Sequence, residues 1–151
     1  MNGAFGPETE CKVLSDQQTL TLVNALDTII PASSERGMPA AGQIGVAEHV
    51  LQGTDFLPAV AAGLSALIDA GFNDLDPPQR VAALNELTVS QPGFLPVLIF
   101  QAYQGYYQNA ATLEALGLPP RPPHPLGYPV EENDLSLLEP VRAREKLYRE
   151  V

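Results

Sequence analysis

Residues 94–108 have the sequence F-L-P-V-L-I-F-Q-A-Y-Q-G-Y-Y-Q, and this stretch decides the fold class. It continues for fifteen residues without the apolar–polar alternation of a strand, whereas strands usually run for about 4–8 residues. It therefore predicts a helix. Apolar side chains cover nearly every side of that helix, which is typical of a buried helix at the centre of a domain.

Four amphipathic helices are predicted before this stretch, each from apolar residues spaced by three and four positions. Their start signals are residues that cap helices or favour a first turn. We expect the helices to begin at Ser15 or Asp16, near Pro39, at Thr54 or Asp55, and at Asp76. The sequence D-P-P-Q at residues 76–79 is the clearest of these signals, because it combines an N-cap, a proline at the first position and a glutamine three residues after the cap.

Glycine and proline mark the other boundaries of the predicted helices. Pro31 ends the first helix, and Gly71 has the position of a glycine that follows a helix C-terminus. Gly42 and Gly45 lie in the second helix, where we expect them to permit close approach of another helix.

The chain changes character after a short helix predicted at residues 110–116. Six prolines fall within residues 119–129, and each one fixes φ and removes a backbone donor, so no regular helix or central strand continues there. An extended, polyproline-like path is expected instead. A turn or short helix at residues 133–138 and a last helix at residues 141–150 complete the prediction.

The predicted fold is all-α: a single compact bundle of about five or six helices with a proline-rich, extended C-terminal arm. Residues 1–13 form an N-terminal lead-in, residues 14–117 the helical domain, and residues 118–151 the C-terminal arm. Apolar and aromatic residues are interspersed among the prolines, and flexible-linker residues are few, so the arm is expected to dock on a partner.

The net charge of −10 argues against a nucleic-acid partner, because phosphate binding needs clustered Lys and Arg. Only Lys12, Arg36 and Arg80 are basic before residue 121, which divides the chain into an acidic body and a nearly neutral arm. No apolar run approaches the roughly 18 residues of a membrane span. The N-terminus carries neither signal-peptide features nor a twin arginine, which favours a cytoplasmic location.

Residue patterns that carry chemistry are missing from the sequence. Cys11 is the only cysteine, so no internal disulfide can form, and its role is left open. The two histidines, His49 and His124, have no metal-ligand spacing, and neither a nucleophile elbow nor a phosphate loop is present. The sequence therefore predicts no catalytic, cofactor-binding or metal-binding residue in this chain. Tyr103, Tyr106 and Tyr107 fit a core seam and an interface hot spot equally well.

Several motifs between residues 15 and 145 follow one another in the order found in a known family. They are L-x-x-x-x-D-x-I-I-P-A at residues 22–32, P-A-A-x-x-x-G-V at 39–46, G-Y-Y at 105–107, L-G at 116–117, R-P-P-H-P-L-G-Y at 121–128 and L-L-E-P-V-R-A-R at 137–144. With these motifs the chain resembles the gluconate 2-dehydrogenase subunit 3 family. The last two motifs are the most specific.

The resemblance implies that the chain is a non-catalytic accessory subunit in a hetero-oligomer. Family members bind and stabilise a large flavoprotein of the glucose–methanol–choline type, which carries FAD and oxidises a sugar, glycoside or sugar acid. Whether a cytochrome c subunit completes the complex of this chain is left open. Many members carry a twin-arginine signal that exports the pair, so a periplasmic complex with an exported partner is the alternative to a cytoplasmic one.

On this basis we expect a docking surface made by the arm and the tyrosine cluster, in which arginines pair with partner carboxylates. Its residues are Tyr103, Tyr106, Tyr107, Arg121, Pro122, Pro123, His124, Tyr128, Leu137, Leu138, Arg142 and Arg144. His124 or Tyr128 could also shape the substrate entrance of the partner. The rival interpretations are a generic helical interaction adaptor and an autonomous helical enzyme.

Overall fold

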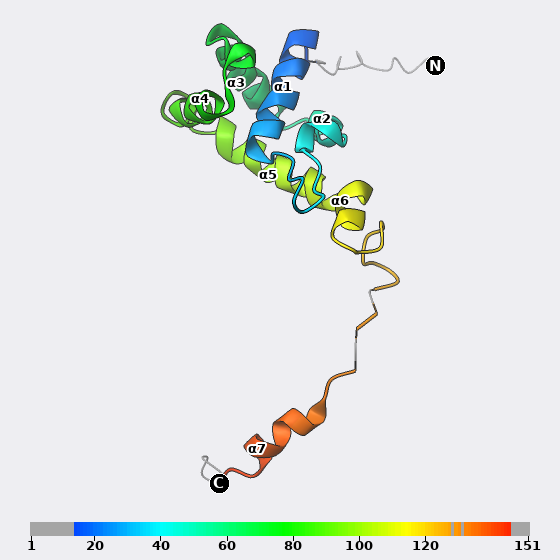
Figure 1. Cartoon of the computed structure of the whole chain (residues 1–151). Helices are drawn as coiled ribbons and strands as arrows, with labels where there is room; N and C mark the ends of the chain where they lie inside the picture. Colours follow the sequence, from blue (N-terminus) through cyan, green and yellow to red (C-terminus); the bar gives the residue numbers. More distant parts are fainter. Residues whose placement is uncertain (1–13, 128, 131, 146–151) are drawn as a thin grey trace, which may run out of the picture. The chain divides into compact units, whose positions relative to one another are not determined.

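The computed structural model describes residues 14–127, 129–130 and 132–145. The chain divides into two units, residues 1–121 (unit 1) and residues 122–151 (unit 2). The described residues form helices joined by turns and loops (Figure 1), with one isolated bridge between Ser33 and Met38 and no strand. The predicted all-α class and its helical bundle are confirmed.

Unit 1 contains the helices of the bundle, and unit 2 contains two short helices. In unit 1 these are α1 (Asp16–Ile29), η1 (Ala41–Gln43), α2 (Val46–Leu51), α3 (Leu57–Asp69), η2 (Phe72–Asp74), α4 (Pro77–Ser90), α5 (Phe94–Gln108) and α6 (Ala110–Ala115). Unit 2 contains η3 (Leu135–Leu138) and α7 (Glu139–Arg142). The predicted last helix at residues 141–150 is wrong in its described part, since α7 ends at Arg142; residues 146–151 lie outside the described residues.

The two helices with the strongest start signals begin where the sequence predicts. Ser15 caps α1 and Asp76 caps α4, and in both cases the glutamine at the third helical position completes a capping box. Gly71 has a φ of 69°, a left-handed conformation that glycine adopts without strain, and it follows the end of α3.

The predicted second and third helices begin later than expected. Residues 39–45 form a loop and the short helix η1, because Gly45 has a φ of 80° and starts α2 only at Val46. Gly45 therefore serves backbone conformation and not close packing. Thr54 and Asp55 do not cap α3, which follows Phe56 without a side-chain cap.

Gly42 does allow the close approach that its sequence position suggested. A Cβ atom at Gly42 would lie 2.8 Å from the carbonyl oxygen of Val23 and 2.7 Å from Oδ1 of Asp27. The backbone N–H of Gly42 also donates a hydrogen bond of 2.7 Å to that Asp27 oxygen. This hydrogen bond and the close contact hold the loop before α2 against α1.

The core of unit 1 is built around α1, which packs against α2, α3, α4 and α5. Its largest fully buried side chains come from α1, α2, α3, η2 and α5: Leu22, Leu26, Val46, Val50, Val60, Leu64, Leu67, Phe72, Phe94, Leu98 and Tyr106. Figure 1 shows α5 running from α4 to α6 and passing α1 on the way. Burying these side chains supplies the main favourable term in folding.

A small polar cluster holds η2 and α4 against α1. The side chain of Asn73 accepts a hydrogen bond from Asn24 and donates one to Thr21, each of 2.9 Å. The carbonyl oxygen of Asn73 accepts a 2.7 Å hydrogen bond from Nη2 of Arg80. The first turn of α4 is therefore connected to α1 through one asparagine.

Candidate docking surface

Helix α5 is not buried on all sides, which corrects the expectation of a fully enclosed helix. Its buried side chains face α1, α2 and α3, whereas four large side chains point outward: Ile99, Phe100, Tyr103 and Tyr107, with exposed fractions of 36%, 58%, 47% and 50%. We call these four residues the α5 face. Ile99, Tyr103 and Tyr107 follow one another at four-residue spacing, so they lie along one side of the helix.

The two exposed tyrosines of the α5 face stack on each other. The ring centroids of Tyr103 and Tyr107 are 6.0 Å apart, and the ring planes differ by 5°. Helix α5 contains no charged residue, in a chain whose net charge is −10. Exposed aromatic side chains with charge depleted around them are typical of the centre of a protein interface.

The opposite side of α5 is anchored to the loop before α2. The hydroxyl of Tyr106 donates a 2.8 Å hydrogen bond to the carbonyl oxygen of Pro39, and the amide of Asn109 donates one to the carbonyl oxygen of Ile44. Gly105 lies against His49, since a Cβ atom there would be 3.0 Å from Cδ2 of the imidazole. The α5 face is thus presented by a helix that is fixed from behind.

Tyr106 belongs to the core and not to the exposed surface, which corrects its place in the predicted docking set. Only 1% of the residue is exposed. Its ring packs edge-on against Tyr107, with centroids 5.3 Å apart and planes at 86°. Burial, together with the neighbouring Tyr107, raises the pKa of Tyr106. The sequence left two interpretations of the tyrosine cluster open, a core seam and an interface. Tyr106 is a core residue, whereas Tyr103 and Tyr107 are exposed and accessible to a partner.

Two hollows adjoin the α5 face, both next to the C-terminal end of α1. One, of about 220 Å³, lies between Ile99 and Tyr103 on α5, Thr28 on α1 and Val81 on α4. The other, of about 320 Å³, lies beside Tyr107 and is closed by Pro31 and by Leu116 after α6. The face therefore borders two depressions, one at Tyr103 and one at Tyr107, that side chains of a second protein can enter.

Within unit 2, no described residue is buried, although many are large and apolar. The exposed apolar side chains include Leu126, Val130, Leu135, Leu137, Leu138 and Val141. Asp134 caps η3 through the hydroxyl and the backbone N–H of Ser136, which donate hydrogen bonds of 2.6 Å and 3.0 Å and lower the pKa of the Asp134 carboxyl.

The predicted docking residues are distributed over both units. Pro122, Pro123 and His124 are exposed at the start of unit 2, and Leu137 and Leu138 are exposed on η3. Arg142 ends α7 and Arg144 follows it, both exposed, while Arg121 is half-buried at the end of unit 1. Tyr128 lies outside the described residues. The structure brings together Tyr103 and Tyr107 within unit 1, and Leu137, Leu138 and Arg142 within unit 2.

Sequence reasoning missed Ile99 and Phe100 as surface residues, because a helix that is apolar on every side gives no periodic signal for its exposed side. Only the tyrosines could have indicated which side of the helix is exposed, since an aromatic ring with a hydroxyl is suited to a boundary between core and water.

No group of three or more His, Cys, Asp and Glu side chains is arranged to hold a metal ion within residues 14–127, 129–130 and 132–145. No helix over those same ranges is long and apolar enough to cross a membrane.

Comparisons of the chain with protein-family models, with curated proteins and with solved structures give no match.

Proposed function

We propose that this chain is a non-catalytic subunit that docks on a larger FAD-dependent oxidoreductase of the glucose–methanol–choline type and stabilises it. The observation that carries the proposal is the α5 face, an exposed aromatic surface on a charge-free helix. Monomeric proteins rarely leave large apolar patches uncovered, and such patches commonly mark interaction sites. The identity of the partner rests on the sequence motifs, above all R-P-P-H-P-L-G-Y and L-L-E-P-V-R-A-R.

Unit 2 supports a docking function by its own composition. Its described residues expose leucines and valines that have no core in which to pack, and prolines at residues 122, 123, 125 and 129 restrict the chain before it binds. A pre-restricted chain loses less conformational entropy when it becomes ordered on a partner. Arg142 and Arg144 can then pair with carboxylates on that partner.

The experiment is affinity purification of the tagged full chain from its native host, followed by visible spectroscopy. We expect a larger polypeptide in stoichiometric amount with the absorption band of oxidised flavin, bleached by the sugar, glycoside or sugar acid that it oxidises. An additional haem spectrum would identify a cytochrome c subunit. A colourless, monomeric chain would overturn the flavoprotein assignment and leave the helical adaptor as the better account.

Two variants test whether the flavoprotein docks on the α5 face. Tyr103→Glu together with Tyr107→Glu places carboxylates at the centre of the face and should reduce the recovered flavin about tenfold or more. Val89→Glu is the matched control, because Val89 is an exposed apolar residue of α4, with an exposed fraction of 88%, and lies outside the face. Equal flavin recovery from both variants would exclude the α5 face as the docking site.

The compartment of the complex is also part of the proposal, with a cytoplasmic location preferred. Cell fractionation that releases the tagged chain and its flavoprotein with the periplasm would show instead that the pair is exported.

A further inference from the structure

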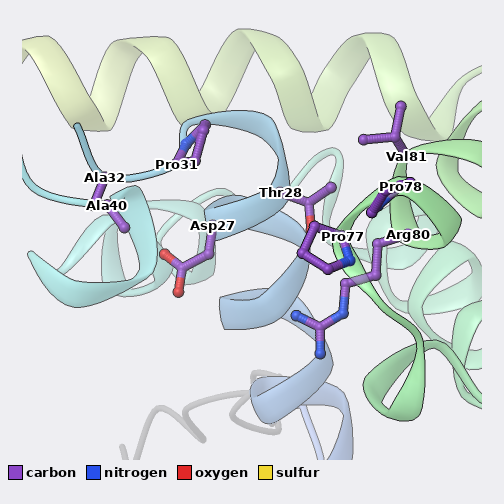
Figure 2. A pocket seen from close by; sticks show the side chains of 9 residues that line it. All are labelled: Asp27, Thr28, Pro31, Ala32, Ala40, Pro77, Pro78, Arg80 and Val81. Carbon is purple, nitrogen blue, oxygen red and sulfur yellow. The ribbon is translucent and has the colours of Figure 1, made fainter. Parts of the chain in front are cut away.

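A cleft opens in unit 1 between the C-terminal end of α1 and the N-terminal end of α4, and it shares Thr28 and Val81 with the hollow beside Ile99 and Tyr103. Its volume is about 540 Å³, within the range of roughly 300–1,000 Å³ that is usual for small-ligand sites. Asp27 and Arg80 both line the cleft, and Figure 2 shows them on different helices, with Thr28 and Pro77 between them and the Asp27 carboxylate directed away from Arg80. We call this hollow the α1–α4 cleft.

The walls of the α1–α4 cleft are mainly apolar. Pro31 follows α1 on one side, Pro77 and Pro78 form the first turn of α4 on the other, and Val81 lies one turn further on. Proline rings are rigid, so these walls keep their shape without a ligand. Apolar walls with a few fixed polar groups are the usual composition of a binding site.

Arg80 is held in place but keeps most of its hydrogen-bonding capacity. Its Nη2 atom donates to the carbonyl oxygen of Asn73, and its guanidinium carbon lies 5.6 Å from the centre of the Phe72 ring. Its Nε atom is buried and has no acceptor, and no carboxylate pairs with Arg80 within the part of the chain that the structure describes. An arginine fixed in this way is prepared to bind a carboxylate, whose geometry matches its donors.

Asp27 limits what can enter beside Arg80. Its Oδ1 atom accepts the hydrogen bond from the backbone N–H of Gly42, and its other oxygen keeps its acceptor capacity for a ligand donor. The charges of Asp27 and Arg80 cancel within the cleft, in a chain whose net charge is −10. A dianion such as phosphate is therefore disfavoured by repulsion, whereas a single carboxylate with a nearby N–H donor is suited to the site.

We propose that the α1–α4 cleft binds the C-terminal end of a short peptide whose last side chain is apolar. The terminal carboxylate pairs with Arg80, the last amide N–H donates to Asp27, and the apolar side chain packs on Pro31, Pro77 and Val81. This proposal does not rest on the proposed flavoprotein partner, because peptide binding by the cleft needs no second subunit, although the cleft adjoins the hollows beside the α5 face.

The test uses the full chain labelled with ¹⁵N and the peptide acetyl-Gly-Ala-Leu with a free carboxylate. We expect saturable chemical-shift changes at Thr28, Arg80 and Val81. The affinity for the same peptide with a C-terminal amide should be lower by a factor of at least about ten, because the amide lacks the charge that pairs with Arg80. Acetyl-leucine alone should also bind more weakly, since it fills only part of the cleft.

Arginine variants complete the test. Arg80→Gln should weaken the free peptide about tenfold, and Arg80→Lys, which keeps the charge but loses the planar donors, should be intermediate. Arg36→Gln is the matched control, because Arg36 lies beside a different hollow. Thermal unfolding establishes that each variant is folded before it is titrated.

Three results would overturn the proposal: no saturable shift with the free peptide at millimolar concentration, equal binding of the amidated peptide, or unchanged binding by a folded Arg80→Gln variant. Equal binding of acetyl-leucine would assign the cleft to a single acylated amino acid and would contradict a peptide site. Competition by inorganic phosphate at the affinity of the peptide would contradict the monocarboxylate class.

Discussion

Gly63 on α3 lies directly against Phe94 at the start of α5. A Cβ atom at this position would lie 2.1 Å from Cδ2 and 2.3 Å from Cγ of Phe94, atoms near the base of a ring that is itself fully buried. The ring cannot move away as the end of a flexible side chain would. The contact between α3 and the start of α5 therefore depends on the missing methyl group.

Gly63→Ala should destabilise the protein, although alanine favours helix. The gain in helix propensity is about 1 kcal/mol, whereas overpacking a closed core contact costs roughly 1–3 kcal/mol, and a 2.1 Å approach belongs at the upper end of that range. We expect a net loss of about 1–2 kcal/mol in urea unfolding. Gly93→Ala is the control, because a Cβ atom there meets nothing within 4 Å and should leave stability unchanged or raised. A stabilised Gly63→Ala variant would contradict the packing.

Tyr106 joins α5 to the loop before α2, and its hydroxyl should contribute measurably to stability. Tyr106→Phe removes the hydrogen bond to Pro39 and should cost about 0.5–1.5 kcal/mol. Tyr107→Phe, at an exposed ring, should change stability by less than about 0.5 kcal/mol. Equal effects in urea unfolding would mean that the buried hydroxyl adds nothing.

The raised pKa of Tyr106 also gives stability a dependence on alkaline pH. The folded state holds the phenolic proton more tightly than the unfolded state, so the contribution is fully present below the unfolded pKa of about 10 and is lost as the pH rises through the folded pKa. Above a pH of about 10, the free energy of unfolding of the Tyr106→Phe variant should therefore fall less steeply with pH than that of the natural chain. Identical alkaline profiles would contradict this assignment.

At the scale of single elements, α4 depends on its capping box. The Asp76 carboxylate accepts a 2.9 Å hydrogen bond from the backbone N–H of Gln79, and the Gln79 side chain accepts one of 3.1 Å from the backbone N–H of Asp76. Asp76→Ala should cost about 1 kcal/mol of unfolding free energy. Asp74→Ala, at a nearby exposed acid, should have an effect below about 0.5 kcal/mol. Equal losses in urea unfolding would point to a general charge effect and not to the cap.

The sequence predicts best those helices whose first residue is determined by a few neighbouring residues. The capping boxes of α1 and α4 are local, and both helices begin where expected. The start of α2 depends on the left-handed backbone of Gly45 and on the hydrogen bond from the N–H of Gly42 to the Asp27 side chain. That hydrogen bond joins two segments that are distant in the sequence. No local pattern contains that information, so this helix was expected too early.

The candidate sites differ in predictability for the same reason. Tyr103 and Tyr107 are close in sequence, but their aromatic character fitted a core seam and an interface equally well, and only the packed structure shows that both rings are exposed. The α1–α4 cleft was missed, because Asp27 and Arg80 come from helices that only the packed core brings together. Tyr106 was placed wrongly because neighbouring positions on a helix can point to opposite environments.

At the scale of the whole molecule, the core belongs to unit 1. All residues of the core cluster fall between Leu14 and Tyr106, and none of the described residues of unit 2 is buried. A chain that ends at Arg121 should keep its helical circular dichroism, and its free energy of unfolding should change by less than about 0.5 kcal/mol. The same truncation should abolish recovery of the flavoprotein that we propose as the partner. A truncated chain that loses cooperative unfolding would show that unit 2 contributes to the core.

The exposure of unit 2 also has a consequence for proteolysis. Trypsin cleaves after arginine, and Arg142 and Arg144 are exposed in unit 2. In unit 1, Arg80 is half-buried within α4, and Arg36 is exposed but lies in a tight turn that two backbone hydrogen bonds between Ser33 and Met38 close. Brief digestion of the free chain should shorten its C-terminal end first and leave the helices of unit 1 intact. A docked partner would shield the same bonds, so the rate at which the C-terminal end is shortened would report the fraction of chains in complex, without any need to know what the partner oxidises.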